Sequence, residues 1–191
     1  LKAVDADRAT VATDMLFSGA DAYQQAIASG ADVIMLATPP GFRPEHCMAA
    51  IQAGKHVFME KPACVDAPGY RTVMKAAQMA DDNGLKIAVG LQRRHSKHYT
   101  GNIAKLHNGE IGDMILLRCY WNGSFARQGY GGQPPKQGEM EWQVRNWNHF
   151  NWLSGDHIVE QHVHNLDIMN WVLGSHPIRA VSGLGGRQVR T

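Results

Sequence analysis

The sequence predicts an α/β fold built on a doubly wound parallel sheet. Helical and strand patterns alternate from residue 21 to residue 91, and such alternation implies parallel strands joined by right-handed crossovers. Residues 32–38 form a short, continuous apolar run rich in branched side chains, which is typical of a strand buried on both faces. After residue 95 the character of the sequence changes, which indicates a second domain.

The elements of the first part have recognisable start and stop signals. Helices are expected at residues 21–29, 44–53 and 66–83, and strands at residues 32–38, 57–59 and 85–91. Gly30 and Gly54 end the first two helices, while Pro44 and Pro68 stand in the first turns of the second and third. The pattern therefore predicts three successive helix–strand units.

Residues 54–62 place a charged pair at the end of a buried strand. The apolar residues Val57–Met59 are followed by Glu60 and Lys61. Pro62 biases Lys61 toward extended geometry, so no helix is expected to begin there. A solvated loop lysine is the alternative for such a motif in isolation. The surrounding pattern favours a ligand site, because open α/β sheets bind ligands at the carboxyl ends of their strands.

Polar groups also follow the neighbouring strands. The three strand ends carry Thr38-Pro39-Pro40, Glu60-Lys61-Pro62 and Gln92-Arg93-Arg94-His95. Exposed loops are polar in any case. In a doubly wound sheet, however, these three ends line one crevice, which favours a ligand-binding pocket there.

The boundary between the two expected domains lies at residues 92–95, which gives domains 1–94 and 95–191. The patterns of the second domain predict helices at 96–107 and 156–173, strands at 115–121 and 178–183, a long loop at 123–138, and a short helical piece among three tryptophans. Loops as long as 123–138 are usually functional or disordered.

The helix expected at 156–173 carries a stripe of ionisable side chains. Offsets of four and three residues place Glu160, His164 and Asp167 on one face. Burying such groups is costly unless they are paired or used, so the stripe indicates either a site or an ion-pair network on a surface helix. A catalytic metal is disfavoured, because His162 and His164 point apart on a helix and only Glu160 shares the His164 face.

The composition excludes several classes of function. The 191 residues carry 19 Lys+Arg against 17 Asp+Glu, and this balance gives no support to nucleic-acid or membrane binding. No apolar run reaches the length of about 20 residues that crosses a bilayer. Three scattered cysteines without a Cys-x-x-Cys favour a reducing compartment. A cytoplasmic location is expected, with periplasmic export left open because the chain begins at Leu1 rather than Met.

Several runs of the sequence resemble the Gfo/Idh/MocA oxidoreductase family. The first domain carries them as Ala31-Asp32-Val33-Ile34, Ala37-Thr38-Pro39-Pro40, His46, and Ala53-Gly54-Lys55-His56-Val57-Phe58-Met59-Glu60-Lys61-Pro62. Glu160-x-x-x-His164-x-x-Asp167 and Gln92-Arg93-Arg94-His95 look like later motifs of the same family. The resemblance runs from about residue 16 to residue 190.

The resemblance implies a Rossmann domain that binds NAD or NADP, followed by an α+β domain with a mostly antiparallel sheet that forms the substrate site. Hydride transfer between nicotinamide and a sugar or cyclitol is the implied reaction, and a homo-oligomer the implied full-length assembly. The implied catalytic residues are Lys61, His164 and Glu160; the implied cofactor-binding residues are Thr38, Pro39, Pro40, His46, Glu60, Lys61 and Gln92; the implied substrate-binding residues are Lys61, Arg93, Asp156, Glu160 and His164. No metal is implied.

In the expected mechanism, Lys61 stabilises the developing alkoxide and His164 accepts the hydroxyl proton. Glu160, at a position where the family usually has aspartate, is expected to orient His164. The chain also lacks the first strand and glycine loop of the family, so we expect a fragment cut at both ends. Two alternatives remain open at this stage: a glycoside hydrolase that uses NAD transiently, and a non-catalytic sugar- or nucleotide-binding homologue.

Overall fold

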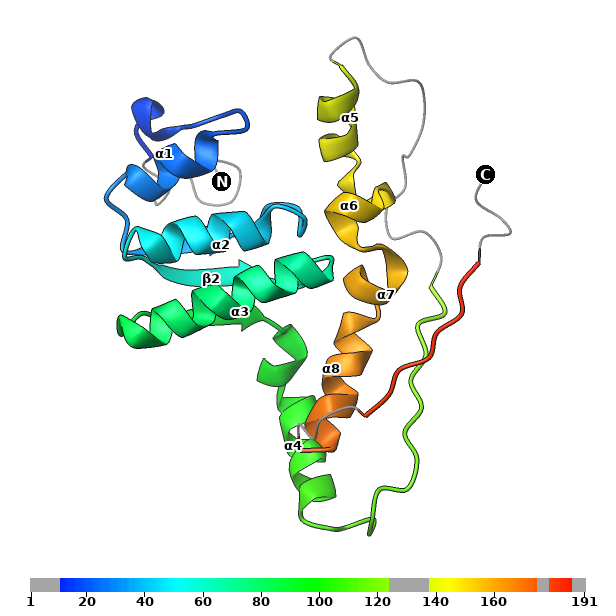
Figure 1. Cartoon of the computed structure of the whole chain (residues 1–191). Helices are drawn as coiled ribbons and strands as arrows, with labels where there is room; N and C mark the ends of the chain where they lie inside the picture. Colours follow the sequence, from blue (N-terminus) through cyan, green and yellow to red (C-terminus); the bar gives the residue numbers. More distant parts are fainter. Residues whose placement is uncertain (1–10, 124–137, 175–178, 187–191) are drawn as a thin grey trace.

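A computed structural model describes residues 11–123, 138–174 and 179–186 (Figure 1). In chain order the elements are η1 (Thr13–Met15), α1 (Ala22–Ala28), β1 (Val33–Leu36), α2 (Arg43–Gln52), β2 (His56–Glu60), α3 (Ala67–Asp82), β3 (Ile87–Gly90), η2 (Gln92–His95), α4 (Lys97–His107), α5 (Glu139–Arg145), η3 (Trp147–His149), α6 (Asn151–Ser154), α7 (Asp156–Glu160) and α8 (Val163–Val172). Figure 1 shows α5–α8 as a column of helices beside the sheet and its helices.

The three strands form one parallel sheet in the order β1-β2-β3. Ile34 pairs with Val57 across β1 and β2, and Val57 pairs with Ile87 across β2 and β3. The crossovers are α2 and α3, so the expected α/β class and its parallel sheet are confirmed. Because the strands are parallel and adjacent, their carboxyl ends meet at one edge of the sheet.

The helix boundaries follow from the local sequence. Asp66 caps α3 by accepting a hydrogen bond from the Gly69 N–H at 2.7 Å, which satisfies one of the free donors of the first turn. Pro44 stands in the first turn of α2, where its missing N–H removes no helical bond. Both helices thus begin within one residue of the expected positions.

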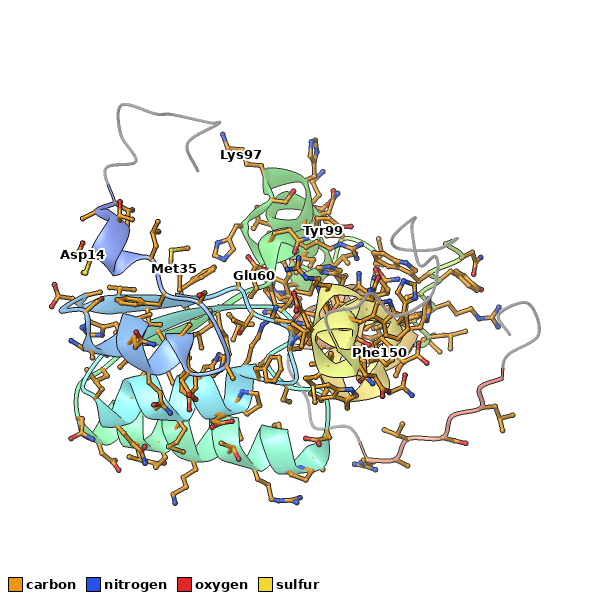
Figure 2. The ribbon with its side chains drawn as sticks, turned by 90° about the horizontal axis from the view of Figure 1, so that it is seen from above. Asp14, Met35, Glu60, Lys97, Tyr99 and Phe150 are labelled. Atoms are coloured by element: carbon orange, nitrogen blue, oxygen red, sulfur yellow. The ribbon has the colours of Figure 1, made fainter. Side chains whose placement is uncertain are left out.

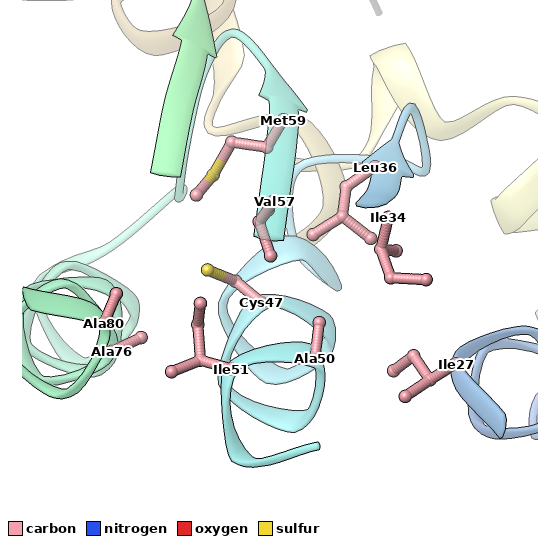
Figure 3. Packing of buried hydrophobic residues seen from close by; sticks show 10 residues of the cluster. All are labelled: Ile27, Ile34, Leu36, Cys47, Ala50, Ile51, Val57, Met59, Ala76 and Ala80. Atoms are coloured by element: carbon pink, nitrogen blue, oxygen red, sulfur yellow. The ribbon is translucent and has the colours of Figure 1, made fainter. Parts of the chain in front are cut away.

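The hydrophobic core lies between the sheet and the helices that cover one of its faces. It contains Ile27, Ile34, Leu36, Cys47, Ala50, Ile51, Val57, Met59, Ala76 and Ala80 (Figure 3). Met59 and Cys47 have no exposed surface. Burial of a side chain of this size stabilises the fold by about 1.5–3 kcal/mol.

The expectation that residues 32–38 form a strand buried on both faces is wrong for the described residues. Ile34 and Leu36 are buried, whereas Val33 and Met35 are 52% and 74% exposed. Side chains alternate between the two faces of a strand, and Figure 2 shows Met35 on the face away from α2 and α3. Within the described chain, the helices that follow β1 and β2 cover only the opposite face.

Two expected strands of the second part are absent from the described residues. Residues 111–123 and 179–186 run without strand structure, and Ile115 and Val181 are 95% and 84% exposed. A strand requires a ladder to a neighbour, and no described segment provides one. Residue 178 and residues 124–137 of the predicted loop lie outside the described residues.

The single helix expected at residues 156–173 is interrupted. The α7 helix ends at Glu160 and α8 begins at Val163. At the break, the His162 N–H donates to the His157 carbonyl five residues back, at 2.9 Å. That bond is of the π type, which widens a helix by one residue and often occurs at functional sites. The interruption rotates α8 relative to α7, so offsets counted across it do not define one face.

Candidate active site

Lys61 joins the carboxyl end of β2 to the helical column. Its Nζ donates hydrogen bonds to the Glu160 carbonyl oxygen at 2.5 Å and to Glu160 Oε1 at 2.8 Å. The side chains are only 15% and 13% exposed. The Lys61–Pro62 peptide is cis. Two residues that lie 99 positions apart in the sequence therefore form one shielded ion pair between the sheet and α7.

The break between α7 and α8 makes this contact possible. In a continuous helix the Glu160 carbonyl would accept the N–H of the residue four positions later. Here that residue, His164, directs its N–H to the Gln161 carbonyl at 3.4 Å. The Glu160 carbonyl is consequently available to Lys61, together with the carboxylate of the same residue.

The second carboxylate oxygen of Glu160 is buried and has no hydrogen-bond partner among the described residues. A buried, unsatisfied acceptor is costly, typically by about 1–3 kcal/mol. Such an atom beside a shielded lysine can accept a hydrogen bond from the hydroxyl group of a bound ligand. Glu160 thus fits a role at a ligand site.

His164 lies at the same junction and is 8% exposed. Its ring stacks on Trp121, with the centroids 5.8 Å apart. Burial lowers the pKa of His164, the positive charges of Lys61 and Arg93 lower it further, and the negative charges of Asp167 and Glu60 oppose that shift. The imidazole is therefore neutral at neutral pH and can accept a proton.

The contact between Glu160 and His164 that the i, i+4 spacing predicts is not found among the described residues. The break at residues 161–162 separates the two side chains onto different helices, and the Glu160 carboxylate binds Lys61 instead. Orientation of His164 by Glu160 is therefore not supported by the geometry. The imidazole is held by burial and by the Trp121 ring.

The two arginines after β3 anchor η2 to α8. Arg93 donates to Asn165 Oδ1 at 2.5 Å and lies 5.6 Å from the centre of the Trp121 ring. Arg94 binds the Asp167 carboxylate through Nε and Nη2 at distances of 2.7–3.1 Å. Arg93 thus stands beside the Trp121–His164 stack, and the pair of Arg94 with Asp167 fixes the helix that carries His164.

The residues expected to bind a cofactor fall into two groups. Pro39 is half-buried, and Glu60 and Gln92 are exposed at the carboxyl edge of the sheet. The Glu60 carboxylate lies against the backbone of Gly90, where an added Cβ would come within 2.9 Å of Oε2 and displace the carboxylate. This exposed edge with a close backbone approach fits a cofactor that lies across the strand ends.

Pro40 and His46 lie beneath that edge instead. Pro40 is fully buried, and His46 is 7% exposed. The His46 ring stacks on Tyr23 with centroids 4.1 Å apart, and its Nδ1 lies 3.3 Å from Thr38 Oγ1. These contacts support the turn after β1 and leave Thr38 as the half-buried polar group of that turn. A cofactor-binding role for Pro40 and His46 remains a prediction.

Asp156 lines a cavity whose lining does not include Lys61. Its backbone has φ of 60°, and its Oδ1 accepts the His157 N–H at 2.7 Å. The cavity has a volume of about 930 Å³ and is also lined by Trp121 and His162. Trp121, which lines the same cavity, stacks on His164. No group of three His, Cys, Asp or Glu residues in the described ranges could hold a metal ion.

Sequence reasoning missed Arg43, the first residue of α2. Its guanidinium is 4% exposed and donates to the carbonyls of Thr38, Glu60 and Pro62 at 2.7–2.9 Å. A signal was present, because a cation at a helix N-terminus opposes the helix dipole. An arginine at that position indicates dedicated acceptors elsewhere.

Residues 3–91 match a family model described as an oxidoreductase family with an NAD-binding Rossmann fold, GFO_IDH_MocA. Inositol 2-dehydrogenase of Azotobacter vinelandii is 29% identical over 144 residues, which are 75% of this chain and 41% of that protein. The scyllo-inositol 2-dehydrogenase (NADP(+)) of Bacillus subtilis is 33% identical over 91 residues, 48% of this chain and 25% of that protein.

Among solved structures, myo-inositol 2-dehydrogenase from Lactobacillus plantarum superimposes with a TM-score of 0.57 and 27% identity. The match covers 80% of this chain and 40% of that one. The Azotobacter vinelandii and Lactobacillus plantarum dehydrogenases match most of this chain. The chain, however, spans only about 40% of the length of each. The matches confirm the expected Rossmann-type fold. The matched family is described as NAD-binding, and the Bacillus subtilis relative is named for NADP(+).

Proposed function

We propose that the protein oxidises a CH–OH group of a cyclitol or sugar with NAD or NADP, because residues 3–91 match the Gfo/Idh/MocA family of NAD-binding oxidoreductases. The observation that carries the proposal is the shielded pair of Lys61 and Glu160 beside the buried His164, at the carboxyl edge of the parallel sheet. The inositol dehydrogenases among its relatives favour a cyclitol.

The residues suited to hold the cofactor are those at the exposed strand ends. Glu60 and Gln92 are exposed there, and Thr38 and Pro39 are half-buried beside them. When bound, the nicotinamide supplies the hydride acceptor for alcohol oxidation. The chain's own contribution is to hold the alcohol, remove its proton and stabilise the charge that develops on its oxygen.

We assign proton removal to His164 and charge stabilisation to Lys61. A neutral, buried imidazole accepts the hydroxyl proton most effectively when its pKa lies near the working pH. The Lys61 ammonium is held in a shielded site, where a preorganised charge stabilises an alkoxide more strongly than it would in water. Glu160 keeps Lys61 in place and offers its free oxygen to a substrate hydroxyl.

Arg93 and Asp156 are the other two residues proposed to bind the substrate, and both lie near Trp121. Arg93 lies over that ring, and Asp156 lines the cavity that the ring borders. A polyol presents several hydroxyl groups, which such donors and acceptors can bind. Substrate binding by Arg93 and Asp156 is part of the same proposal as the roles of Lys61 and His164.

The proposal extends to the setting of the intact protein, for which we infer a reducing cytoplasm and a homo-oligomer. The free thiols of Cys47, Cys64 and Cys119 support the first inference. Exposed apolar side chains on the extended segments, including Ile115 and Val181, support the second. Within the described residues, no helix is both long and apolar enough to cross a membrane.

The test is cofactor reduction by the intact protein. Purified enzyme is incubated with NAD or NADP and with each of myo-inositol, scyllo-inositol and glucose, and the reduced nicotinamide is followed by absorbance. Turnover of a cyclitol is expected. Release of nitrophenol from a nitrophenyl glycoside without net cofactor reduction would instead indicate a glycoside hydrolase, and binding without any turnover would indicate a non-catalytic homologue.

A further inference from the structure

Arg43 is a buried cation with an unusual set of partners. It is 4% exposed, and its hydrogen bonds within the described residues go to backbone carbonyls rather than to carboxylates. Nε donates to Thr38 at 2.8 Å, and Nη1 donates to Glu60 at 2.9 Å and to Pro62 at 2.7 Å. One guanidinium therefore ties the turn after β1 to the turn after β2.

Two of these three acceptors stand immediately before and after Lys61. The backbone on both sides of Lys61 is thus held by the Arg43 guanidinium. That guanidinium belongs to α2 and also binds the Thr38 carbonyl. Burial lowers the pKa of Arg43 against the opposing influence of Glu160 and Glu60, but an arginine side chain keeps its charge in proteins. A permanent buried charge of this kind is costly, and a purely structural turn can be built without one.

We propose that Arg43 is a positioning residue for Lys61, fixing its backbone so that Nζ reaches Glu160 and stands beside His164. The arrangement of residues 60–62 around one guanidinium carries this inference, and only the description of Lys61 as catalytic rests on the proposed function. A misplacement of about 1 Å in a catalytic group can lower a rate by about 10²-fold. Such a fixed backbone gives Lys61 little freedom to move.

The shape of the guanidinium is central to the inference. Arginine presents its donors in a rigid planar fork, whereas lysine has a single rotating ammonium on a flexible stem. A lysine side chain in place of Arg43 could satisfy some of the carbonyls but could not hold all three in the same geometry. Arg43→Lys is therefore expected to loosen Lys61 while preserving the buried charge.

The test reads the position of Lys61 from the titration of His164 by NMR, in the intact protein without cofactor. The groups that act on His164 are Lys61 and Arg93, which lower its pKa, and Asp167 and Glu60, which raise it; its ring also stacks on Trp121. Arg43 is not among them. Arg43→Lys keeps the positive charge, so a change in the His164 pKa that Arg43→Lys shares with Arg43→Met reports movement of Lys61 rather than loss of the Arg43 charge.

Replacement of Lys61 by Met should raise the His164 pKa, because a positive neighbour is removed. Arg43→Met should also raise the His164 pKa, by a comparable amount, and Arg43→Lys should raise it by less. In the double variant Arg43→Met/Lys61→Met, the rise should not exceed that of either single variant. Arg71→Met, on the exposed side of α3, is the matched control and should leave the titration unchanged.

An unchanged His164 pKa in Arg43→Met, beside a raised one in Lys61→Met, would overturn the proposal. If Arg43→Met does not fold, Arg43→Lys decides in the same way. The measurement needs no turnover, so it separates this inference from the proposed function. A protein without dehydrogenase activity in which Arg43→Met still moves the His164 pKa keeps the positioning role and loses the assigned reaction.

Discussion

Residues 21–91 and the chain from Lys97 onward use their apolar side chains in different ways. The whole buried cluster, from Ile27 to Ala80, belongs to the first region. Among the described residues of the second, the buried hydrophobic side chains are Ile103 and Leu153, while Ile115 and Leu184 are almost fully exposed. The first region contains the hydrophobic core, and the second contributes few buried apolar side chains.

The two regions differ in whether their extended segments have a pairing partner in the described chain. Each strand of the sheet finds its neighbour after a single crossover helix, so α2 and α3 bury one face as the sheet forms. The extended segments 111–123 and 179–186 have no such local partner in the described chain. Without a ladder to a neighbouring strand, the apolar side chains of these segments stay exposed.

One substitution in each region tests this difference in burial. Met59→Ala removes most of a fully buried side chain at the centre of the sheet and should lower the free energy of unfolding by about 2–5 kcal/mol. Ile115→Ala, at a 95% exposed position, should change it by no more than about 0.5 kcal/mol. Urea denaturation of the purified chain measures both. Equal losses would show that segment 111–123 is buried in solution.

The same difference explains how much of the fold could be predicted. Helices and strands through β3 were predicted to within a few residues, because periodicity and glycine stops are local signals. The strand at 115–121 has the same kind of pattern but no partner in the described chain, and pattern alone cannot supply one. The break at Gln161–His162 carries neither Gly nor Pro, so periodicity predicted one continuous helix.

Lys61 joins the two regions through its contact with Glu160. Its replacement is expected to affect catalysis more than stability. Lys61→Met retains the length of the side chain and removes its charge. The kcat of the intact enzyme should fall by about 10²-fold or more, the scale of losing one preorganised stabiliser. Lys55→Met, at the turn before β2, is the control and should retain kcat.

A rise in KM with kcat preserved would contradict that assignment. Uniform loss of binding energy affects KM, whereas loss of an interaction made in the transition state affects kcat. In that outcome Lys61 would be a binding residue for substrate or cofactor, and the stabilisation of the alkoxide would have to come from another group.

Three of the residues predicted for the site lie at one junction, their roles stay predictions, and their pairing was not predicted. Lys61, Glu160 and His164 were expected together, and the structure places all three at one junction. Their partners depend on the break between α7 and α8, which turns Glu160 toward Lys61. Arg43 was missed because its partners are carbonyl oxygens, which every residue has, so no residue type in the sequence marks them.

A double-mutant cycle measures the coupling between Lys61 and Glu160, which lie in different regions. Lys61→Met and Glu160→Gln should be strongly non-additive in kcat/KM, with a coupling of about 0.5–3 kcal/mol, because the two side chains share a hydrogen bond. Glu160→Gln and His164→Ala should show the smaller coupling. The reverse order would restore Glu160 as the residue that orients His164.

The smallest effect concerns the buried histidines, one in each region. Burial lowers the pKa of His46 and of His164 below the ordinary value of 6.5. The unfolded chain therefore binds more protons below about pH 6.5, and stability falls as the pH drops from there toward the folded-state values. Above that pH both rings are neutral in either state, and their contribution is complete.

Each histidine can contribute a slope of at most about 1.4 kcal/mol per pH unit in this window. His164→Asn and His46→Asn should each flatten the dependence of the unfolding free energy on pH between neutral and mildly acidic conditions. His98→Asn, on the exposed surface of α4, should leave it unchanged. If only His46→Asn has an effect, the imidazole at the junction is solvated in the folded protein, and the reduced basicity assigned to His164 must be withdrawn.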